Sequence, residues 1–140
     1  MPEVLFVEVN ANQMEARACE IAERIYAQGN RLQIIAADEE QAARMDDLLW
    51  TYSPDSFVPH GIWKGFDNEI AQPVVITSRQ EWVEGIEYLL MLDYCELEVL
   101  RRFSRAVHMV VNDSRERLET SRRYWTQLKE AGFSLRHQKR

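Results

Sequence analysis

The stretch "RLQIIAADEEQAARMDDLL" (residues 31–49) decides the expected fold. Residues 31–37 are mostly apolar and predict a buried strand. Asp38 then predicts a helix start, because an N-cap Asp with Gln41 three residues later can satisfy free backbone N–H groups. Apolar residues follow at helical spacing, at Ala42, Met45, Leu48 and Leu49. A strand that leads directly into an amphipathic helix is half of a β-α-β unit.

The residues before this stretch repeat the pattern. "VLFVEV" (residues 4–9) is nearly continuous in apolar residues and predicts a strand covered on both faces. A helix is expected next, and Gly29 with Asn30 predicts its end. Its apolar stripe consists of Met14, Ala18, Ile21, Ala22 and Ile25. Strand, helix, strand and helix joined by short connections predict a parallel sheet with right-handed crossovers.

The rest of the chain extends the same architecture. Residues 61–73 resemble a loop, and a last helix is expected to open at Asp113 with Glu116 and to stop near Gly132. Three more central strands are expected at residues 73–78, 86–92 and 107–111. We therefore expect one α/β domain over residues 1–140, with three layers around a mostly parallel, Rossmann-like central sheet.

Composition narrows the class of protein. The 140 residues are 46% hydrophobic and 29% charged, as in one ordinary globular domain. Cys19 and Cys95 lie far apart, without a CxxC pair or ligand spacing, so we expect buried thiols in a reducing cytosol and no metal. No basic leader and no apolar run of about 18 residues is present. The sequence predicts a soluble cytoplasmic protein.

The sequence shows no catalytic or cofactor signature. The turn after the first strand, "EVNANQMEAR" (residues 8–17), lacks glycine, and neither GxGxxG nor GxxxxGK[ST] occurs. The three histidines are scattered, and no GxSxG occurs. We expect no catalytic residue, metal or cofactor. The alternative is a small nucleotide-dependent or hydrolytic enzyme on the same scaffold, with a Ser, a His and an Asp brought together only by folding.

Charge is unevenly distributed along the chain. The net charge is −6, but residues 1–100 carry −13 and residues 101–140 carry +7. An acidic body with a basic C-terminal end indicates a local anionic partner on one side. The alternative interpretation is an uneven solvated surface.

The expected C-terminal helix, "SRERLETSRRYWTQLKEA" (residues 114–131), carries that positive charge. At 100° per residue, the predicted buried stripe consists of Leu118, Ser121, Trp125 and Leu128. Three cations spaced by seven residues border the stripe, with the Glu residues farther round; they are Arg115, Arg122 and Lys129. This arrangement suits an anionic peptide with an apolar end. The alternatives are an ordinary amphipathic helix and weak direct binding of single-stranded nucleic acid.

A second candidate surface lies in "LLWTYSPDSFVPHG" (residues 48–61). The segment has the Ser, Pro and Asp residues typical of a loop but is rich in aromatic residues. A turn around residues 53–55 could bring Trp50, Phe57 and Pro59 together as an apolar patch at the edge of the sheet. The alternative is a loop that packs on itself.

This stretch also carries a resemblance. Together with "GNRLQIIAADEEQAARMDD" (29–47), "ACEIAERIYAQG" (18–29) and "RRYWTQLKEAGF" (122–133), it resembles the chi subunit of bacterial DNA polymerase III. The resemblance implies a non-catalytic replisome adaptor whose fold is like that of mononucleotide-binding proteins but which binds no nucleotide. It also implies DNA contact only through partners.

The resemblance implies two binding sites. Chi proteins bind the acidic C-terminal tail of single-stranded DNA-binding protein (SSB) through an Arg and an aromatic three residues later, here Arg122 and Trp125. Arg115 and Lys129 are expected to add attraction, and Val111 to wall the apolar pocket beside Trp125. The surface that meets the psi subunit, which joins chi to the clamp loader, matches Trp50, Phe57 and Pro59. Thr126 stands where a further basic residue is common, so a less cationic pocket is expected.

Overall fold

The computed structural model describes residues 2–52, 57–63 and 72–138. The strands are β1 (Glu3–Val9), β2 (Leu32–Ile35), β3 (His60–Ile62), β4 (Val74–Thr77), β5 (Tyr88–Met91), β6 (Arg105–Val111) and β7 (Ser134–Gln138). The helices are α1 (Met14–Ala27), α2 (Glu39–Thr51), α3 (Leu97–Leu100) and α4 (Arg115–Glu130), and a 3-10 turn, η1 (Ala11–Gln13), precedes α1.

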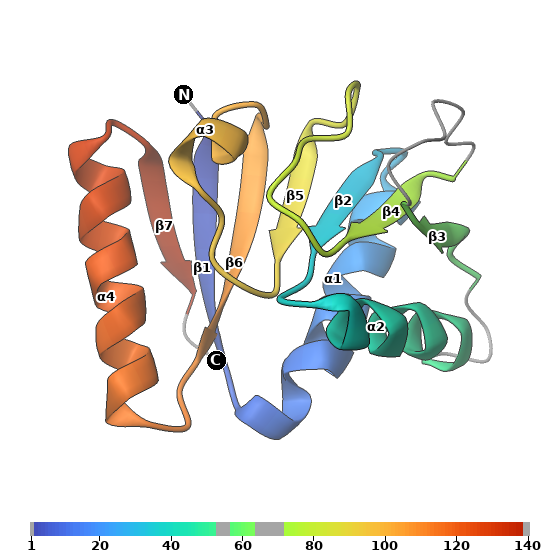
Figure 1. The fold of residues 1–140 in the computed structure, drawn as a ribbon, viewed down its shortest axis with the longest axis horizontal. Coiled ribbons are helices and arrows are strands. Elements are labelled where there is room, and N and C mark those ends of the chain that lie inside the picture. Colours follow the sequence, from blue (N-terminus) through green and yellow to red (C-terminus); the bar gives the residue numbers. More distant parts are fainter. Residues whose placement is uncertain (1, 53–56, 64–71, 139–140) are drawn as a thin grey trace.

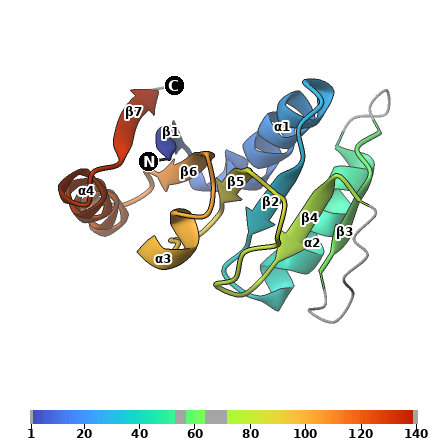
Figure 2. The same cartoon turned by 90° about the horizontal axis from the view of Figure 1, so that it is seen from above.

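The seven strands of the described chain form one sheet in the order β3-β4-β2-β5-β6-β1-β7 (Figure 1). Every neighbouring pair is parallel. Figure 2, from above, shows α1 and α4 on opposite sides of this sheet. The predicted three-layer α/β fold is confirmed, and the sheet is parallel throughout its described strands.

Each face of the sheet has its own hydrophobic core. On one face, α1 and α2 bury Ala18 and Met45 against inward residues such as Val7 and Ile34. On the other face, α4 and the loop before β5 bury Leu128 and Ile86 against residues such as Phe6, Ile35 and Val110. Because both faces are covered, the central strands are almost wholly apolar, which explains the uninterrupted runs in the sequence.

The helix starts follow local hydrogen bonding. The Asp38 carboxylate accepts a hydrogen bond of 2.8 Å from Gln41 N, so the predicted cap of α2 is confirmed. The cap of α4 is Ser114, whose Oγ accepts from Arg117 N at 3.2 Å. The prediction that Asp113 opens this helix was therefore one residue early; its carboxylate lies 3.6 Å from Nε of Arg117 instead. Gly29 has a φ of 85°, which explains the glycine that ends α1.

Two strands lie outside the predictions. β3 begins at His60, so the predicted loop over residues 61–73 was wrong at Gly61 and Ile62. β7, "SLRHQ", follows the last helix, where no strand was expected. β3 has only three residues, and β7 is mostly exposed at the edge of the sheet, so neither shows a clear apolar pattern. β7 nevertheless pairs with β1 in register and contributes to the site described next.

Candidate functional site

Helix α4 packs on the sheet through a stripe that is shifted from the predicted one toward Tyr124. Leu128 is fully buried, and Ser121 and Tyr124 are nearly so. The Tyr124 hydroxyl donates a hydrogen bond of 2.7 Å to the carbonyl of Cys95. Trp125 and Leu118, which the helical projection placed on the side of the stripe bordered by the cations, are only half-buried. The helix is therefore rotated so that its Trp125 side remains open to solvent.

That rotation opens a pocket of about 480 Å³ between α4 and strands β1, β6 and β7. Its lining consists of Phe6, Glu8, Val110, Leu118, Ser121, Arg122, Trp125 and His137; we call it the α4 pocket. The Trp125 ring stands edge-on to the Phe6 ring, with 5.0 Å between centroids. The volume lies within the usual range for binding sites, and most of the wall is apolar.

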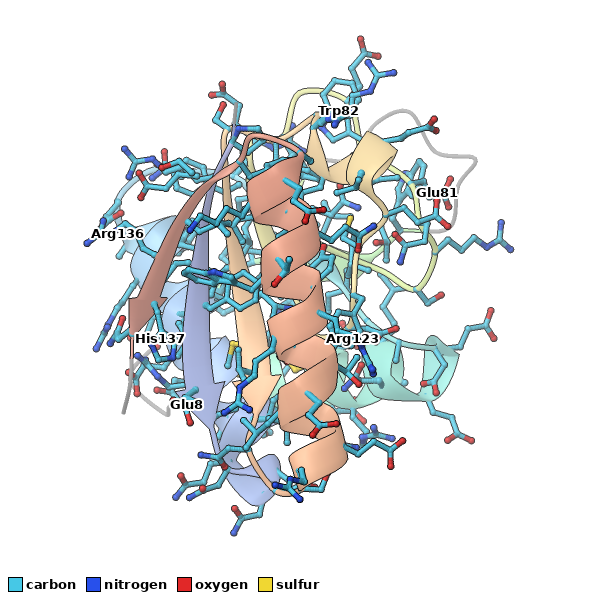
Figure 3. The ribbon with its side chains drawn as sticks, turned by 90° about the vertical axis from the view of Figure 1, so that its left-hand side faces the viewer. Glu8, Glu81, Trp82, Arg123, Arg136 and His137 are labelled. Carbon is cyan, nitrogen blue, oxygen red and sulfur yellow. The ribbon has the colours of Figure 1, made fainter. Side chains whose placement is uncertain are left out.

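Three ionisable side chains line the α4 pocket, namely Arg122, Glu8 and His137. Arg122 is exposed at the rim, and its guanidinium has no ion pair within the described part of the chain. Nε2 of His137 lies 3.3 Å from Oε2 of Glu8, which is 19% exposed. In Figure 3 these two residues lie on the β7 side of α4, whereas Arg123 projects from its other side. The unpaired Arg122 can therefore form a charge-assisted contact with an incoming carboxylate.

The other predicted residues of this site fall outside the pocket. Lys129 is exposed in the last turn of α4 and does not line it. Arg115 is 92% exposed and lies 3.8 Å from Glu119, so the expectation that the cations lack i+4 partners was wrong for Arg115.

Val111 faces the opposite side of the sheet. It packs on the core beneath α1 and α2, and the pocket wall is its neighbour Val110. The predicted position of Val111 beside Trp125 was therefore wrong. Side chains alternate between the two faces of a strand, so an error of one residue reverses the face.

Besides Val110, sequence reasoning missed Phe6, Glu8 and His137. Glu8 did leave a signal, because it is a single charged residue inside the apolar run of residues 4–9. His137 left none, since its strand was not predicted. All three reach the pocket only through the pairing of β1 with β6 and β7.

The second candidate surface is the pair Trp50 and Phe57, which are 51% and 65% exposed. Their ring centroids lie 5.6 Å apart, although the residues are seven positions apart in the chain. Pro59 follows Phe57 by two residues and is half-buried. Its carbonyl accepts a hydrogen bond of 3.3 Å from Val74 N of β4. The turn predicted at residues 53–55 lies outside the described residues. We call Trp50, Phe57 and Pro59 the aromatic patch.

His60 supports the aromatic patch from beneath. Its ring centroid lies 4.3 Å from that of Trp50. Nδ1 lies 2.7 Å from the Val58 carbonyl and Nε2 lies 2.9 Å from the Asp46 carbonyl, so a backbone oxygen faces each ring nitrogen. A large exposed aromatic pair held on a rigid base is typical of a protein-binding surface.

Chemistry-bearing groups elsewhere have structural explanations. Cys19 and Cys95 are buried and free, and burial raises the pKa of each thiol to about 12. Both therefore remain protonated thiols with low nucleophilicity. Burial lowers the pKa of His108 to about 3, among the rings of Phe6, Tyr94 and Tyr124.

Residues 2–52, 57–63 and 72–138 contain no cluster of three or more His, Cys, Asp or Glu side chains that could hold a metal. Nor does any helix in these ranges have the length and apolarity to cross a membrane.

Comparison with known proteins identifies relatives over most of the chain. A family model described as "DNA polymerase III chi subunit, HolC" matches residues 1–136. The chain is 32% identical over 128 residues to DNA polymerase III subunit chi of Escherichia coli (strain K12), covering 87% of this chain and 82% of that relative. The same subunit of Pseudomonas aeruginosa is 25% identical over 118 residues (84% and 80%). That of Haemophilus influenzae is 26% identical over 123 residues (87% and 84%).

Proposed function

Since this chain belongs to the DNA polymerase III chi subunit family and is thereby a component of DNA replication, we propose that it acts as a non-catalytic adaptor in the replisome. The α4 pocket binds the acidic C-terminal tail of SSB, and the aromatic patch binds psi or an equivalent partner that leads to the clamp loader. DNA is reached only through these proteins, and the location is the cytoplasm, where bacterial replication takes place.

The tail proposal rests on the guanidinium of Arg122, which lies at the rim of an apolar pocket and has no ion pair with any described residue. An acidic tail with an aromatic C-terminal residue needs an apolar cavity for its last side chain and a cation that binds its carboxylates. Trp125 and Phe6 supply the cavity walls. The carboxylate of Glu8 in this pocket lies 3.3 Å from Nε2 of His137.

Titration calorimetry tests this proposal. An Asp-rich peptide that ends in Pro-Phe is expected to bind with a 1:1 stoichiometry. The same peptide with an amidated C-terminus is the control and should bind more weakly, because it lacks one carboxylate near Arg122. A folded protein that gives no detectable heat at high micromolar concentration would contradict the tail proposal.

The aromatic patch is proposed to bind the second partner. Two aromatic side chains, Trp50 and Phe57, are exposed side by side above His60, which orders Trp50 before binding. Pre-ordered aromatic residues lose little conformational entropy on docking, which is why they dominate many interfaces.

Replacing Trp50 or Phe57 by Ala is expected to weaken the second partner at least about tenfold, with tail binding unchanged. Ile62→Ala is the matched control, because Ile62 is also a large exposed apolar side chain, 40% exposed, on β3. The measurement is a pull-down from the native lysate with mass spectrometry. If both aromatic variants fold and retain every partner, this surface has no docking role.

A further inference from the structure

A groove lies on the side of the sheet opposite the α4 pocket. It has a volume of about 250 Å³ and runs between α1 and the outer strands β6, β1 and β7. In Figure 2, α1 stands over the middle of the sheet, and β1 and β7 extend beyond it. We call this hollow the α1 groove.

The floor of the α1 groove is apolar. Leu5 of β1 pairs in register with Val107 of β6, so their side chains lie next to each other on the same face. Both are only half-buried, and both line the groove. Ile21 and Ile25 form its wall on the α1 side. Partly exposed aliphatic side chains here gain free energy when a ligand covers them.

Four arginines also line the α1 groove. They come from three different elements and are Arg17 and Arg24 of α1, Arg105 of β6 and Arg136 of β7. Arg17, Ile21, Arg24 and Ile25 recur at helical spacing, so α1 turns one mixed basic and aliphatic stripe toward the groove. In Figure 3, Arg136 extends from β7 away from α4. Four guanidinium groups around one hollow stand out in a chain whose net charge is −6.

The acidic residues beside the groove leave this charge partly unbalanced. Glu20 is shared, because it contacts Arg17 and also lies 3.1 Å from Nη2 of Arg24. Glu3 lies 3.4 Å from Nη1 of Arg136. Within the described chain, two carboxylates therefore pair with arginines of a groove that has four guanidinium groups.

Two of these guanidinium groups have free hydrogen-bonding capacity. Arg105 is exposed and has no ion pair among the residues described here. The side chain of Arg17 is only 8% exposed, and its Nε is buried without a hydrogen-bond partner in the described chain. An incoming carboxylate can bind the exposed guanidinium of Arg105 directly. At the other arginines it competes with the carboxylates of Glu3 and Glu20.

We propose that the α1 groove is a second peptide-binding site, which takes an acidic segment of a protein partner with aliphatic residues between its carboxylates. The arginines bind the carboxylates, and the Leu5 and Val107 floor covers the aliphatic side chains. A nucleic-acid backbone fits less well, because Glu3 and Glu20 interrupt the positive charge and the floor offers no contact to phosphate. The site lies on the opposite face from the α4 pocket and needs no C-terminal carboxylate.

Nuclear magnetic resonance of the full chain tests this proposal. The probe is an eight-residue peptide that alternates Asp or Glu with Leu or Ile and has both ends blocked. It should shift backbone amide signals of α1, β6 and β7 around the groove and leave those around Trp125 unchanged. The double variant Arg105→Gln/Arg136→Gln should weaken this binding at least about tenfold, since it removes two charge-assisted contacts. Arg117→Gln/Arg123→Gln removes the same charge from α4 without changing a residue of the α4 pocket, and it should leave the peptide affinity unchanged.

Four outcomes would overturn the proposal. They are no shifts in the groove, shifts confined to the α4 pocket, equal weakening by both double variants, and equal binding of a peptide with Ser in place of Leu and Ile. Stronger shifts of the groove with oligo-dT than with the peptide would assign the site to nucleic acid instead. A concentration-dependent dimer in sedimentation that the Arg105→Gln variant abolishes would make a second copy of the chain the occupant.

Discussion

Replacement of His108 by leucine is expected to make the free energy of unfolding less sensitive to acid. Below pH 6.5, the protonation of His108 in the unfolded chain lowers the free energy of unfolding of the parent protein by about 1.4 kcal/mol per pH unit, and the variant lacks this loss. In the folded protein, burial lowers the pKa of His108 from 6.5 to about 3, so the ring stays neutral there. The unfolded chain takes up a proton near pH 6.5 and therefore binds more protons than the folded chain at lower pH. The stability is fully present above pH 6.5 and is lost as the pH falls toward 3.

The surroundings of His108 explain why it remains neutral. Aromatic rings of Phe6, Tyr94 and Tyr124 enclose it at centroid distances of 4.9 to 5.2 Å. Neither ring nitrogen has a hydrogen-bond partner among the described residues. Leucine has no polar atoms to leave unsatisfied, so the variant should be at least as stable as the parent protein at pH 7.5.

Urea unfolding at pH 7.5 and pH 4.5 measures this effect. The parent protein should lose about 2 to 3 kcal/mol more than His108→Leu between these two pH values. His137→Leu is the matched control, because His137 is a half-exposed histidine paired with Glu8. Parallel pH dependences of the parent and His108→Leu proteins would show that His108 is not buried in its neutral form.

Arg122→Ala is expected to weaken binding of the acidic peptide about 30-fold, or about 2 kcal/mol. The guanidinium lines the α4 pocket and has no ion pair in the ranges that the structure covers. Its contact with a carboxylate is thus gained without breaking an existing pair. The pocket wall reduces its exposure to water once the peptide is bound, which strengthens the contact relative to one at an open surface.

Arg123→Ala is the control for Arg122→Ala. Arg123 is the next residue of α4, is exposed, and projects from the other side of the helix (Figure 3). The two variants have the same charge, so equal losses of affinity in calorimetry would mean that only net charge matters. A change of less than about threefold for Arg122→Ala would contradict a partly desolvated contact between this guanidinium and the carboxylates of the peptide.

Features of the fold that depend on neighbouring residues could be predicted from the sequence. The Asp38 cap and the Gly29 helix end each depend on contacts within four residues. The central strands are recognisable because both faces of a parallel sheet are covered. β7 could not be recognised in this way, because its exposed polar residues are held in a strand mainly by pairing with β1.

The binding surfaces also have parts that could be predicted from neighbouring residues and parts that depend on tertiary contacts. The sequence alone indicated that Arg122 and Trp125 share one side of a helix, because helical spacing determines which residues lie together. It also showed that Trp50 and Phe57 belong to one short segment. Helical spacing could not show that Phe6, Glu8 and His137 complete the pocket, or that Val110 rather than Val111 faces it. Phe6 and Glu8 lie more than 100 positions before α4 in the chain, and the pocket forms only when β1 and β7 pair and α4 rotates to bury Tyr124.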